Sequence, residues 1–188
     1  MFGKYLLNTD YIMMPFGELI RRKEFIFDTL SWDVFEHKVF IRPDSGNKTF
    51  TGTVVHEDNW VDAVSKLGFY DVDPSSIVIV SETKNIGNEW RLVIIEGKVI
   101  AASKYKSYGL IKMEEGCPKD VKKFGEDMAK LYSPERCFTI DICDEKDGTY
   151  LSIVEINSFS SSGLYVCDKS AVVEAVSHAA LNEWKEYQ

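Results

Sequence analysis

The sequence predicts an α+β fold with mostly antiparallel strands, for three reasons. Two strand–turn–strand patterns, around Glu96-Gly97 and Asp147-Gly148, are typical of β-hairpins. Strands and helices do not alternate regularly, as they would in a doubly wound parallel sheet. There is no glycine-rich dinucleotide fingerprint and no P-loop, because the glycines and the lysine of SGNKTFTG (45–52) have the wrong spacing. The 188 residues, 45% of them hydrophobic, can bury one substantial core or two small lobes that share a cleft.

Eleven elements are expected from apolar periodicity and from the residues that interrupt it. In chain order they are helix Glu18–Leu30, strand Val34–Pro43, strand Thr53–His56, helix Asn59–Leu67, strand Ser76–Glu82, strand Trp90–Ile95, strand Lys98–Lys104, helix Pro118–Tyr132, strand Cys137–Asp144, strand Tyr150–Asn157 and helix Lys169–Tyr187. Pro43 ends the first strand. Asp58 can cap the second helix, which Gly68 ends. The apolar run in SIVIVSE indicates a buried strand.

The two later helices are predicted from their apolar residues. Pro118 stands at a natural first helical position. The residues at helical spacing after it are Val121, Phe124, Met128 and Leu131. The last helix carries its apolar residues on one side: Val172, Val173, Val176, Ala180 and Trp184.

Composition excludes several classes of function. A net charge of −8 argues against a general binder of nucleic acid or of anionic membranes, which needs a basic surface. We therefore expect no DNA partner. No apolar run approaches the roughly 18 residues of a membrane span, and the N-terminus lacks a signal-peptide layout. The cysteines form no CxxC pair and are expected to be reduced, mostly buried thiols of a cytoplasmic protein: Cys117, Cys137, Cys143 and Cys167.

Polar side chains gather where the strand YLSIVEIN ends. Glu155 and Asn157 are two residues apart, so they share one face of the strand. A three-residue turn (146–148) with a left-handed Gly148 would set Asp141 of the preceding strand opposite Ile153. That register places Asp141 on the face of Glu155 and diagonal to it.

The length of this turn decides the face. A two-residue turn would set Asp141 opposite Val154, on the wrong face, and we expect the longer turn. Two carboxylates and an amide oxygen that converge would repel and be poorly solvated unless a hard cation joined them. Mg²⁺ suits such ligands and usually completes its octahedron with substrate phosphates. The alternative is that Glu155 and Asn157 form a solvated strand edge and a turn.

Basic and acidic residues follow one another in a recognisable series along the chain. In order it comprises Arg42-Pro43, Lys48 with TFTG, the apolar strand ending in Glu82, Glu89-x-Arg91, Asp141 and Glu155-x-Asn157. This series resembles the ATP-grasp superfamily of ATP-dependent carboxylate–amine ligases. It resembles more closely the divergent bacterial and phage clade marked by two arginines and a lysine. The resemblance covers roughly Val34 to Tyr165.

The resemblance implies an architecture of two small α+β lobes with ATP between them. The expected lobes are 34–82 and 83–188. Most ligases of the family carry a further N-terminal domain that helps to bind the carboxylate. The segment 1–33 is too short for that domain and is expected to be a reduced or missing version of it, unless a partner subunit supplies the role. The loop over the phosphates is also short and not glycine-rich.

The resemblance also implies roles for individual residues. Asp141, Glu155 and Asn157 match the Mg²⁺ ligands. Arg42 stands where most members carry a phosphate-binding lysine, and an arginine there keeps the charge but binds bidentately. Arg91 matches a basic residue that reaches the γ-phosphate or the acyl phosphate. The remaining matches are Lys48 in the loop over the phosphates, Ser81, Glu82, Thr83 and Lys84 in the hinge that reads the adenine edge, and Ser103 and Lys104 beside Arg91.

Three functions follow as hypotheses. The first is an ATP- and Mg²⁺-dependent ligase that joins a carboxylate to an amine through an acyl phosphate, with a peptide or protein end among the candidate substrates. The second is an ATP-grasp phosphotransferase or nucleotide-binding module that forms no amide. The third is a mixed α+β binding or structural protein in which the series is coincidental. Oligomerisation is left open.

Overall fold

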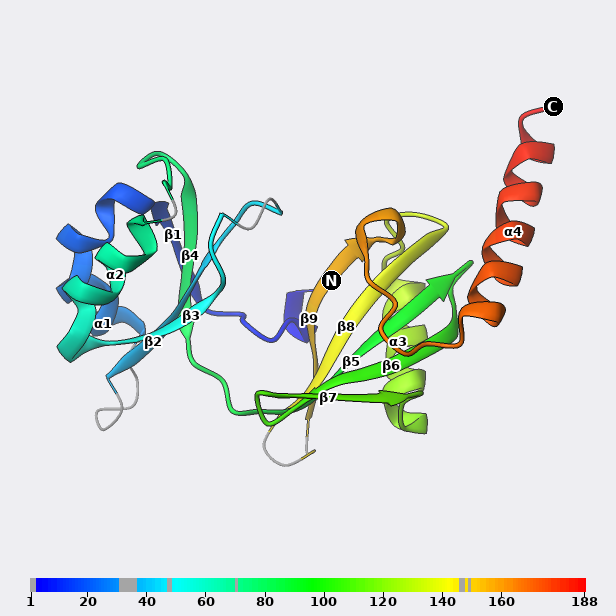
Figure 1. Cartoon of the computed structure of the whole chain (residues 1–188), viewed down its shortest axis with the longest axis horizontal. Helices are drawn as coiled ribbons and strands as arrows, with labels where there is room; N and C mark the ends of the chain where they lie inside the picture. Colours follow the sequence, from blue (N-terminus) through cyan, green and yellow to red (C-terminus); the bar gives the residue numbers. More distant parts are fainter. Residues whose placement is uncertain (1–2, 31–36, 47–48, 70, 146–147, 149) are drawn as a thin grey trace. The chain divides into compact units, whose positions relative to one another are not determined.

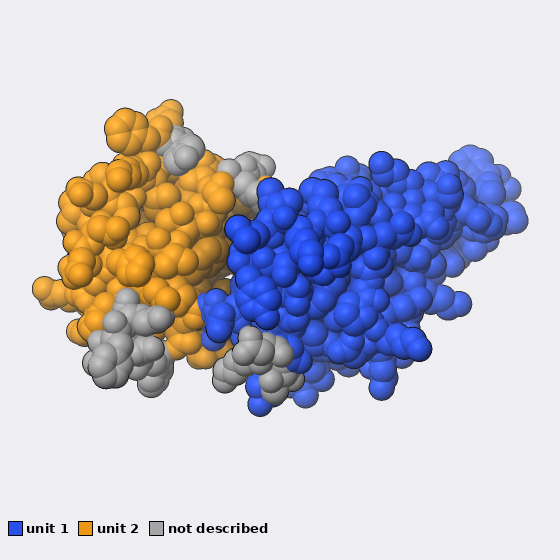
Figure 2. Space-filling view, turned by 60° about the horizontal axis from the view of Figure 1, so that its bottom comes forward, with its two compact units in different colours: residues 1–7, 84–188 blue, residues 8–83 orange. Residues whose placement is uncertain are grey.

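The chain forms two compact units, each with its own antiparallel sheet. The computed structural model describes residues 3–30, 37–46, 49–69, 71–145, 148 and 150–188. Unit 1 comprises Met1–Leu7 and Lys84–Gln188, and unit 2 comprises Asn8–Thr83 (Figure 2). The expected α+β class with mostly antiparallel sheets is confirmed.

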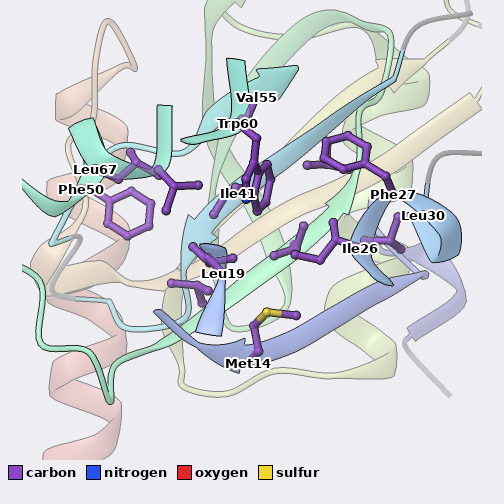
Figure 3. Packing of buried hydrophobic residues seen from close by; sticks show 14 of the residues in the cluster. Met14, Leu19, Ile26, Phe27, Leu30, Ile41, Phe50, Val55, Trp60 and Leu67 are labelled. Carbon is purple, nitrogen blue, oxygen red and sulfur yellow. The ribbon is translucent and has the colours of Figure 1, made fainter. Parts of the chain in front are cut away.

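Unit 2 is a four-stranded sheet with two helices. Its elements are β1 (Tyr11–Pro15), α1 (Lys23–Leu30), β2 (Lys38–Pro43), β3 (Thr53–His56), α2 (Trp60–Gly68) and β4 (Ile77–Glu82). The strand order is β1-β4-β2-β3. The side chains that alternate toward α1 and α2 form one core around the fully buried Trp60 and Ile41 (Figure 3). The other face of the sheet carries Phe40 and Arg42.

Unit 1 is a five-stranded sheet with one helix packed on each face. Its elements are β5 (Ile86–Ile95), β6 (Lys98–Ser107), β7 (Leu110–Glu115), α3 (Lys119–Leu131), β8 (Cys137–Glu145), β9 (Tyr150–Ser158) and α4 (Lys169–Glu186) (Figure 1). The strand order is β7-β6-β5-β8-β9. On β5, Leu92 and Ile94 pack toward α3, whereas Val93 and Ile95 pack toward α4. The inner strands are therefore buried on both faces, which explains their nearly unbroken apolar runs.

Two edge strands were absent from the expected elements. β1 and β7 close one edge of each sheet. All six residues of β7 are exposed, so this strand carries no burial pattern. β1 and α1 lie in the stretch 1–33, and they belong to unit 2.

Several expected elements differ in their bounds. The helix predicted from Glu18 begins as two 3₁₀ turns and becomes α-helical only at Lys23. The strand predicted from Val34 begins at Lys38 among the described residues. The predicted cap at Asp58 is wrong, because a 3₁₀ turn over Glu57–Asn59 leads into α2.

The apolar side predicted for the last helix is also wrong. Val173 and Trp184 are 64% and 66% exposed. The sheet is instead met by residues at a spacing of three and four: Val172, Ala175, Val176 and Ala179. Asp168 caps this helix by accepting a hydrogen bond from the Ala171 amide at 3.1 Å.

The register of the β8–β9 hairpin differs from the expected one. Glu145 pairs with Tyr150, so four residues lie between the strands, and Lys146 and Asp147 of the expected turn lie outside the described residues. Gly148 has the predicted left-handed backbone, at φ +88°. A β-bulge at Val154 then adds a second offset, and Asp141 stands directly opposite Glu155 rather than Ile153. The shared face was predicted, but the register was not.

Two further expectations concern membranes and thiols. None of the described helices combines the length and the apolarity needed to span a bilayer. All four cysteines are free thiols; Cys143 and Cys167 are buried, and Cys117 and Cys137 are half-buried.

Candidate functional site

One row of side chains crosses four strands of unit 1 on the face that α4 shares. Ser103 of β6 stands opposite Arg91 of β5, which stands opposite Asp141 of β8, which stands opposite Glu155 of β9. Three separate pairings thus bring these residues together, because directly opposed side chains in a sheet are nearest neighbours. Asn157 lies one step further along β9 and donates its amide to Glu155 Oε1 at 2.9 Å.

Arg91 and Asp141 form a buried, two-armed ion pair. Arg91 Nε donates to Asp141 Oδ1 at 2.8 Å, and Arg91 Nη2 donates to Asp141 Oδ2 at 2.7 Å. Arg91 Nη2 also lies 3.4 Å from Glu155 Oε1. Arg91 is 8% exposed and Asp141 is 1% exposed. The guanidinium therefore links both carboxylates from below the surface.

The loop after β9 closes over the same arginine. Arg91 Nη1 donates to the Gly163 carbonyl at 3.1 Å, and the guanidinium carbon lies 5.0 Å from the centre of the Tyr165 ring. Tyr165 has a left-handed backbone, at φ +51°, and stacks on Tyr105 with ring centres 4.9 Å apart. The Tyr105 hydroxyl donates to Glu89 at 2.9 Å. These contacts fix the plane of the guanidinium.

Burial and charge set the protonation of the pair. Burial raises the pKa of Asp141 to about 6, although the hydrogen bonds and charge of Arg91 oppose that shift. Burial works to lower the pKa of Arg91, but Asp141 outweighs it and raises this pKa above its ordinary value. The guanidinium stays charged at any ordinary pH, so only Asp141 can change its charge near neutrality.

Glu155 and Asn157 provide the accessible oxygen atoms of this cluster. The Glu155 side chain is 35% exposed. In the part of the chain that the structure describes, neither Glu155 Oε2 nor Asn157 Oδ1 accepts a hydrogen bond. No three His, Cys, Asp or Glu side chains among the described residues gather as a metal cluster. Two carboxylates and an amide nevertheless fit Mg²⁺ by donor type, because this ion prefers oxygen ligands and keeps several waters.

A second arginine lies on the sheet face of unit 2 that faces away from its helices. Arg42 is exposed, stands opposite Ile79 of β4 and donates to the Pro43 carbonyl at 3.2 Å. Phe40 lies beside it on the same strand face. Gly52 packs against both, since a Cβ there would lie 2.5 Å from Phe40 Cζ and 3.4 Å from Arg42 Cβ. The face combines apolar surface with one positive charge.

The other predicted residues are placed as follows. Ser81 and Glu82 end β4, and Thr83 and Lys84 begin the connection to β5. Ser81 is fully buried and donates to the Glu82 carbonyl at 3.3 Å. Lys48 lies outside the described residues.

Lys104 differs from its neighbour Ser103. Strand alternation sets it on the opposite sheet face, where its ammonium pairs with Glu114 of β7. The structure therefore does not bring Lys104 to the Arg91 row. Ser103 Oγ, by contrast, accepts the Val166 amide at 3.4 Å and ties the loop after β9 to the row.

Three residues of the site were not predicted: Tyr105, Gly163 and Tyr165. Tyr105 shares the face of Ser103 by alternation, but the expected strand stopped at Lys104, one residue short of it. Gly163 and Tyr165 lie in a serine-rich loop whose return to the sheet has no local sequence signal.

The comparisons with known proteins decide the family. The family model for the ATP-grasp domain of the clade marked by two arginines and a lysine, family 2 of that clade, matches residues 21–175. The chain belongs to the ATP-grasp family. No curated protein matches it. The resemblance drawn from the residue series is thus confirmed at the level of the family.

Solved structures show the same ATP-grasp fold. D-cycloserine synthetase DcsG has a TM-score of 0.65 at 12% identity over 95% of this chain and 66% of that chain. D-alanine–D-alanine ligase from Bacillus anthracis has a TM-score of 0.60 at 16% identity, over 98% and 65%. ATP-grasp ligase PsnB, complexed with a minimal precursor, has a TM-score of 0.52 at 17% identity, over 90% and 54%. The ATP-grasp chain described here spans about two thirds or less of the length of these proteins.

Proposed function

We propose that the protein is an ATP- and Mg²⁺-dependent ligase that joins a carboxylate to an amine through an acyl phosphate. The observation that carries this proposal is the row Arg91–Asp141–Glu155, with Asn157 beside it, in an ATP-grasp domain. Neighbours of the same fold are ligases by name, and PsnB is described with a precursor peptide and AMPPNP and with Mg and ADP. A peptide or protein end is therefore among the substrates to test.

The proposed roles divide between the two units. Asp141, Glu155 and Asn157 hold Mg²⁺, which, when bound, neutralises charge on the β- and γ-phosphates. Arg91 and Arg42 supply positive charge to the transferring phosphoryl group. The other proposed contacts to ATP are Lys48 above the phosphates, Lys104 on β6, and Ser81, Glu82, Thr83 and Lys84 at the adenine edge.

The chemistry needs no protein nucleophile. A carboxylate oxygen of the substrate attacks the γ-phosphorus, and ADP leaves. The amine then attacks the acyl carbon, and phosphate leaves. Both steps depend on positioning and on charge neutralisation, which the arginines and carboxylates can provide. The buried Arg91 is held in one orientation by Asp141 and Gly163, so little reorganisation is required of it.

The experiment is a screen for release of ADP and phosphate from Mg·ATP, with amino acids and short peptides as carboxylate and amine donors. The ligase predicts release that depends on both donors, together with an amide product in the mass spectrum. Phosphorylated product without amide would indicate a phosphotransferase. A melting temperature unchanged by Mg·ATP would indicate neither, since a ligand at about 100 Kd adds roughly 2.7 kcal/mol of stability.

Glu155→Ala tests the carboxylate at the exposed end of the row. Turnover should fall by a factor of about 10²–10³ or more, because a preorganised group is lost from the phosphoryl-transfer site. Folding should persist, since Glu155 is 35% exposed. Glu174→Ala, on the exposed side of α4, is the matched control and should behave as wild type. Wild-type turnover in Glu155→Ala would refute the metal assignment.

A further inference from the structure

Arg91 occupies the place where a cation is proposed to bind. Its guanidinium engages both oxygens of Asp141, at 2.8 and 2.7 Å, and reaches Glu155 Oε1 at 3.4 Å. A divalent ion on these two carboxylates would share them with a fixed positive charge a few ångströms away. Charges of the same sign repel strongly at such distances in a buried site. The two cations therefore oppose each other as the side chains are now arranged.

We propose that Arg91 is an internal counter-ion that competes with the divalent cation for Asp141 and Glu155, until phosphate oxygens give Arg91 a second partner. Bound nucleotide then binds the guanidinium, and the carboxylates are released to the metal. This inference rests on the proposed function, since the phosphates are those of ATP. It makes Arg91 a positioning residue for the metal as well as a phosphate contact.

The surroundings of Arg91 allow this exchange. The Gly163 carbonyl, at 3.1 Å, and the Tyr165 ring, at 5.0 Å, hold the guanidinium independently of the carboxylates. The planar fork that matches two carboxylate oxygens matches two phosphate oxygens equally well. Arg91 can therefore change its partner by a small rotation, without losing every contact.

A measurable consequence is strong coupling between metal and nucleotide. The free cation should bind weakly, because it must displace an arginine that has nowhere else to pair. Nucleotide removes that competition, and by reciprocity the metal strengthens nucleotide binding by the same factor. The site would accept Mg²⁺ and nucleotide together in preference to free Mg²⁺.

The test measures binding of Mn²⁺, which suits the same oxygen ligands, to the full chain with and without ADP. Free Mn²⁺ is counted by electron paramagnetic resonance. Without ADP, Arg91→Gln should bind Mn²⁺ about tenfold or more tightly than wild type, because a charge-assisted contact no longer opposes the metal. The factor by which ADP strengthens Mn²⁺ binding should shrink accordingly.

Arg136→Gln is the matched control for the loss of one positive charge. Arg136 lies in the same unit and pairs with Glu96 and Glu186 at the surface. Its Mn²⁺ affinity should match wild type. Adding Glu155→Gln to Arg91→Gln should abolish the gain and so locate the ion. The proposal is overturned if Arg91→Gln binds Mn²⁺ no more tightly than Arg136→Gln, or if the gain survives without Glu155.

A second measurement needs no variant. In the wild-type protein labelled with ¹⁵N, the Nε–H signal of Arg91 should exchange slowly with water, since this group donates to a carboxylate that is 1% exposed. Mg·ADP should shift the signal and change its exchange rate. An unchanged signal with Mg·ADP bound would overturn the proposal. Both readouts are binding equilibria, so a protein that binds nucleotide without forming an amide would refute the proposed ligase and leave this inference intact.

Discussion

The two arginines predicted to bind phosphate have contrasting surroundings. Arg91 lies within the sheet of unit 1, is 8% exposed and is held by Asp141 and the Gly163 carbonyl. Arg42 lies on an exposed sheet face of unit 2. Among the described residues, its guanidinium donates only to the Pro43 carbonyl. One charge is already paired within the protein, and the other points to solvent.

This difference separates folding from binding. A buried ion pair couples its two members, because removal of one leaves an uncompensated charge in the interior. An exposed arginine makes no such demand on the fold, and its substitution changes mainly what the surface can bind. Substitutions in the Arg91 row should therefore affect stability and activity together, whereas those around Arg42 should affect binding with little cost in stability.

The largest effect is expected for Asp141→Ala. This change leaves the Arg91 guanidinium buried and charged, and should lower the free energy of unfolding by about 3–5 kcal/mol. Arg42→Ala should change it by less than about 0.5 kcal/mol. Urea denaturation followed by circular dichroism measures both. Arg91→Met should cost less than Asp141→Ala, because a carboxyl can take up a proton and a guanidinium cannot lose one. Equal stability of Asp141→Ala and Arg42→Ala would remove the distinction between the two regions.

The next effect concerns pH. The pKa of Asp141 is raised from 3.8 to about 6 by burial, so between these values the folded protein binds more protons than the unfolded chain. The contribution of Asp141 to stability therefore rises as pH falls from 7 to 4, by roughly 1–3 kcal/mol. Exposed Arg42 has no such carboxylate partner among the described residues, so the effect belongs to the Arg91 row.

Asp141→Asn isolates that contribution from all other titrations. The gain in the free energy of unfolding between pH 7 and pH 4 should be smaller in this variant than in the wild type by the amount given above. Urea denaturation at pH 4, 5, 6 and 7 measures it. Parallel pH profiles for the two proteins would show that the pKa of Asp141 is not raised.

Local pattern explains what could be predicted of the fold. β3 has the expected bounds, and β8 and β9 lie within one residue of theirs, because apolar runs between turn residues mark such strands. β7 was missed because a fully exposed edge strand has no buried face to reveal it. The apolar face of α4 was misplaced because the sequence offers two apolar stripes, and only packing against the sheet selects one.

The site was predicted in part for the same reason. Glu155 and Asn157 share a face by the two-residue period alone. Asp141 joined them through a hairpin, although a bulge at Val154 altered its partner. The pairing of Arg91 with Asp141 joins residues 50 apart in the sequence, on strands that no turn connects. Such a register depends on the whole sheet, so neither the ion pair nor its consequences for the metal could be predicted.

The smallest effect is expected in the exposed region, for Gly52→Ala. The new methyl group would lie 2.5 Å from Phe40 Cζ and 3.4 Å from Arg42 Cβ, so the ring and the base of the arginine must shift. We expect a loss of about 1 kcal/mol or less in the free energy of unfolding. Affinity for Mg·ADP should fall by about fivefold, because the displaced arginine meets the phosphate less well. Isothermal titration calorimetry measures this affinity.

Gly46→Ala is the control for that substitution, because a methyl group at Gly46 meets nothing within 4 Å. Both glycines lie between β2 and β3, so the two variants differ mainly in contact with Phe40 and Arg42. Equal affinities for Mg·ADP would mean that the geometry of Arg42 is unimportant and that its charge alone matters. A loss of stability in Gly52→Ala as large as that of Asp141→Ala would mean that the exposed face, too, is held together for folding.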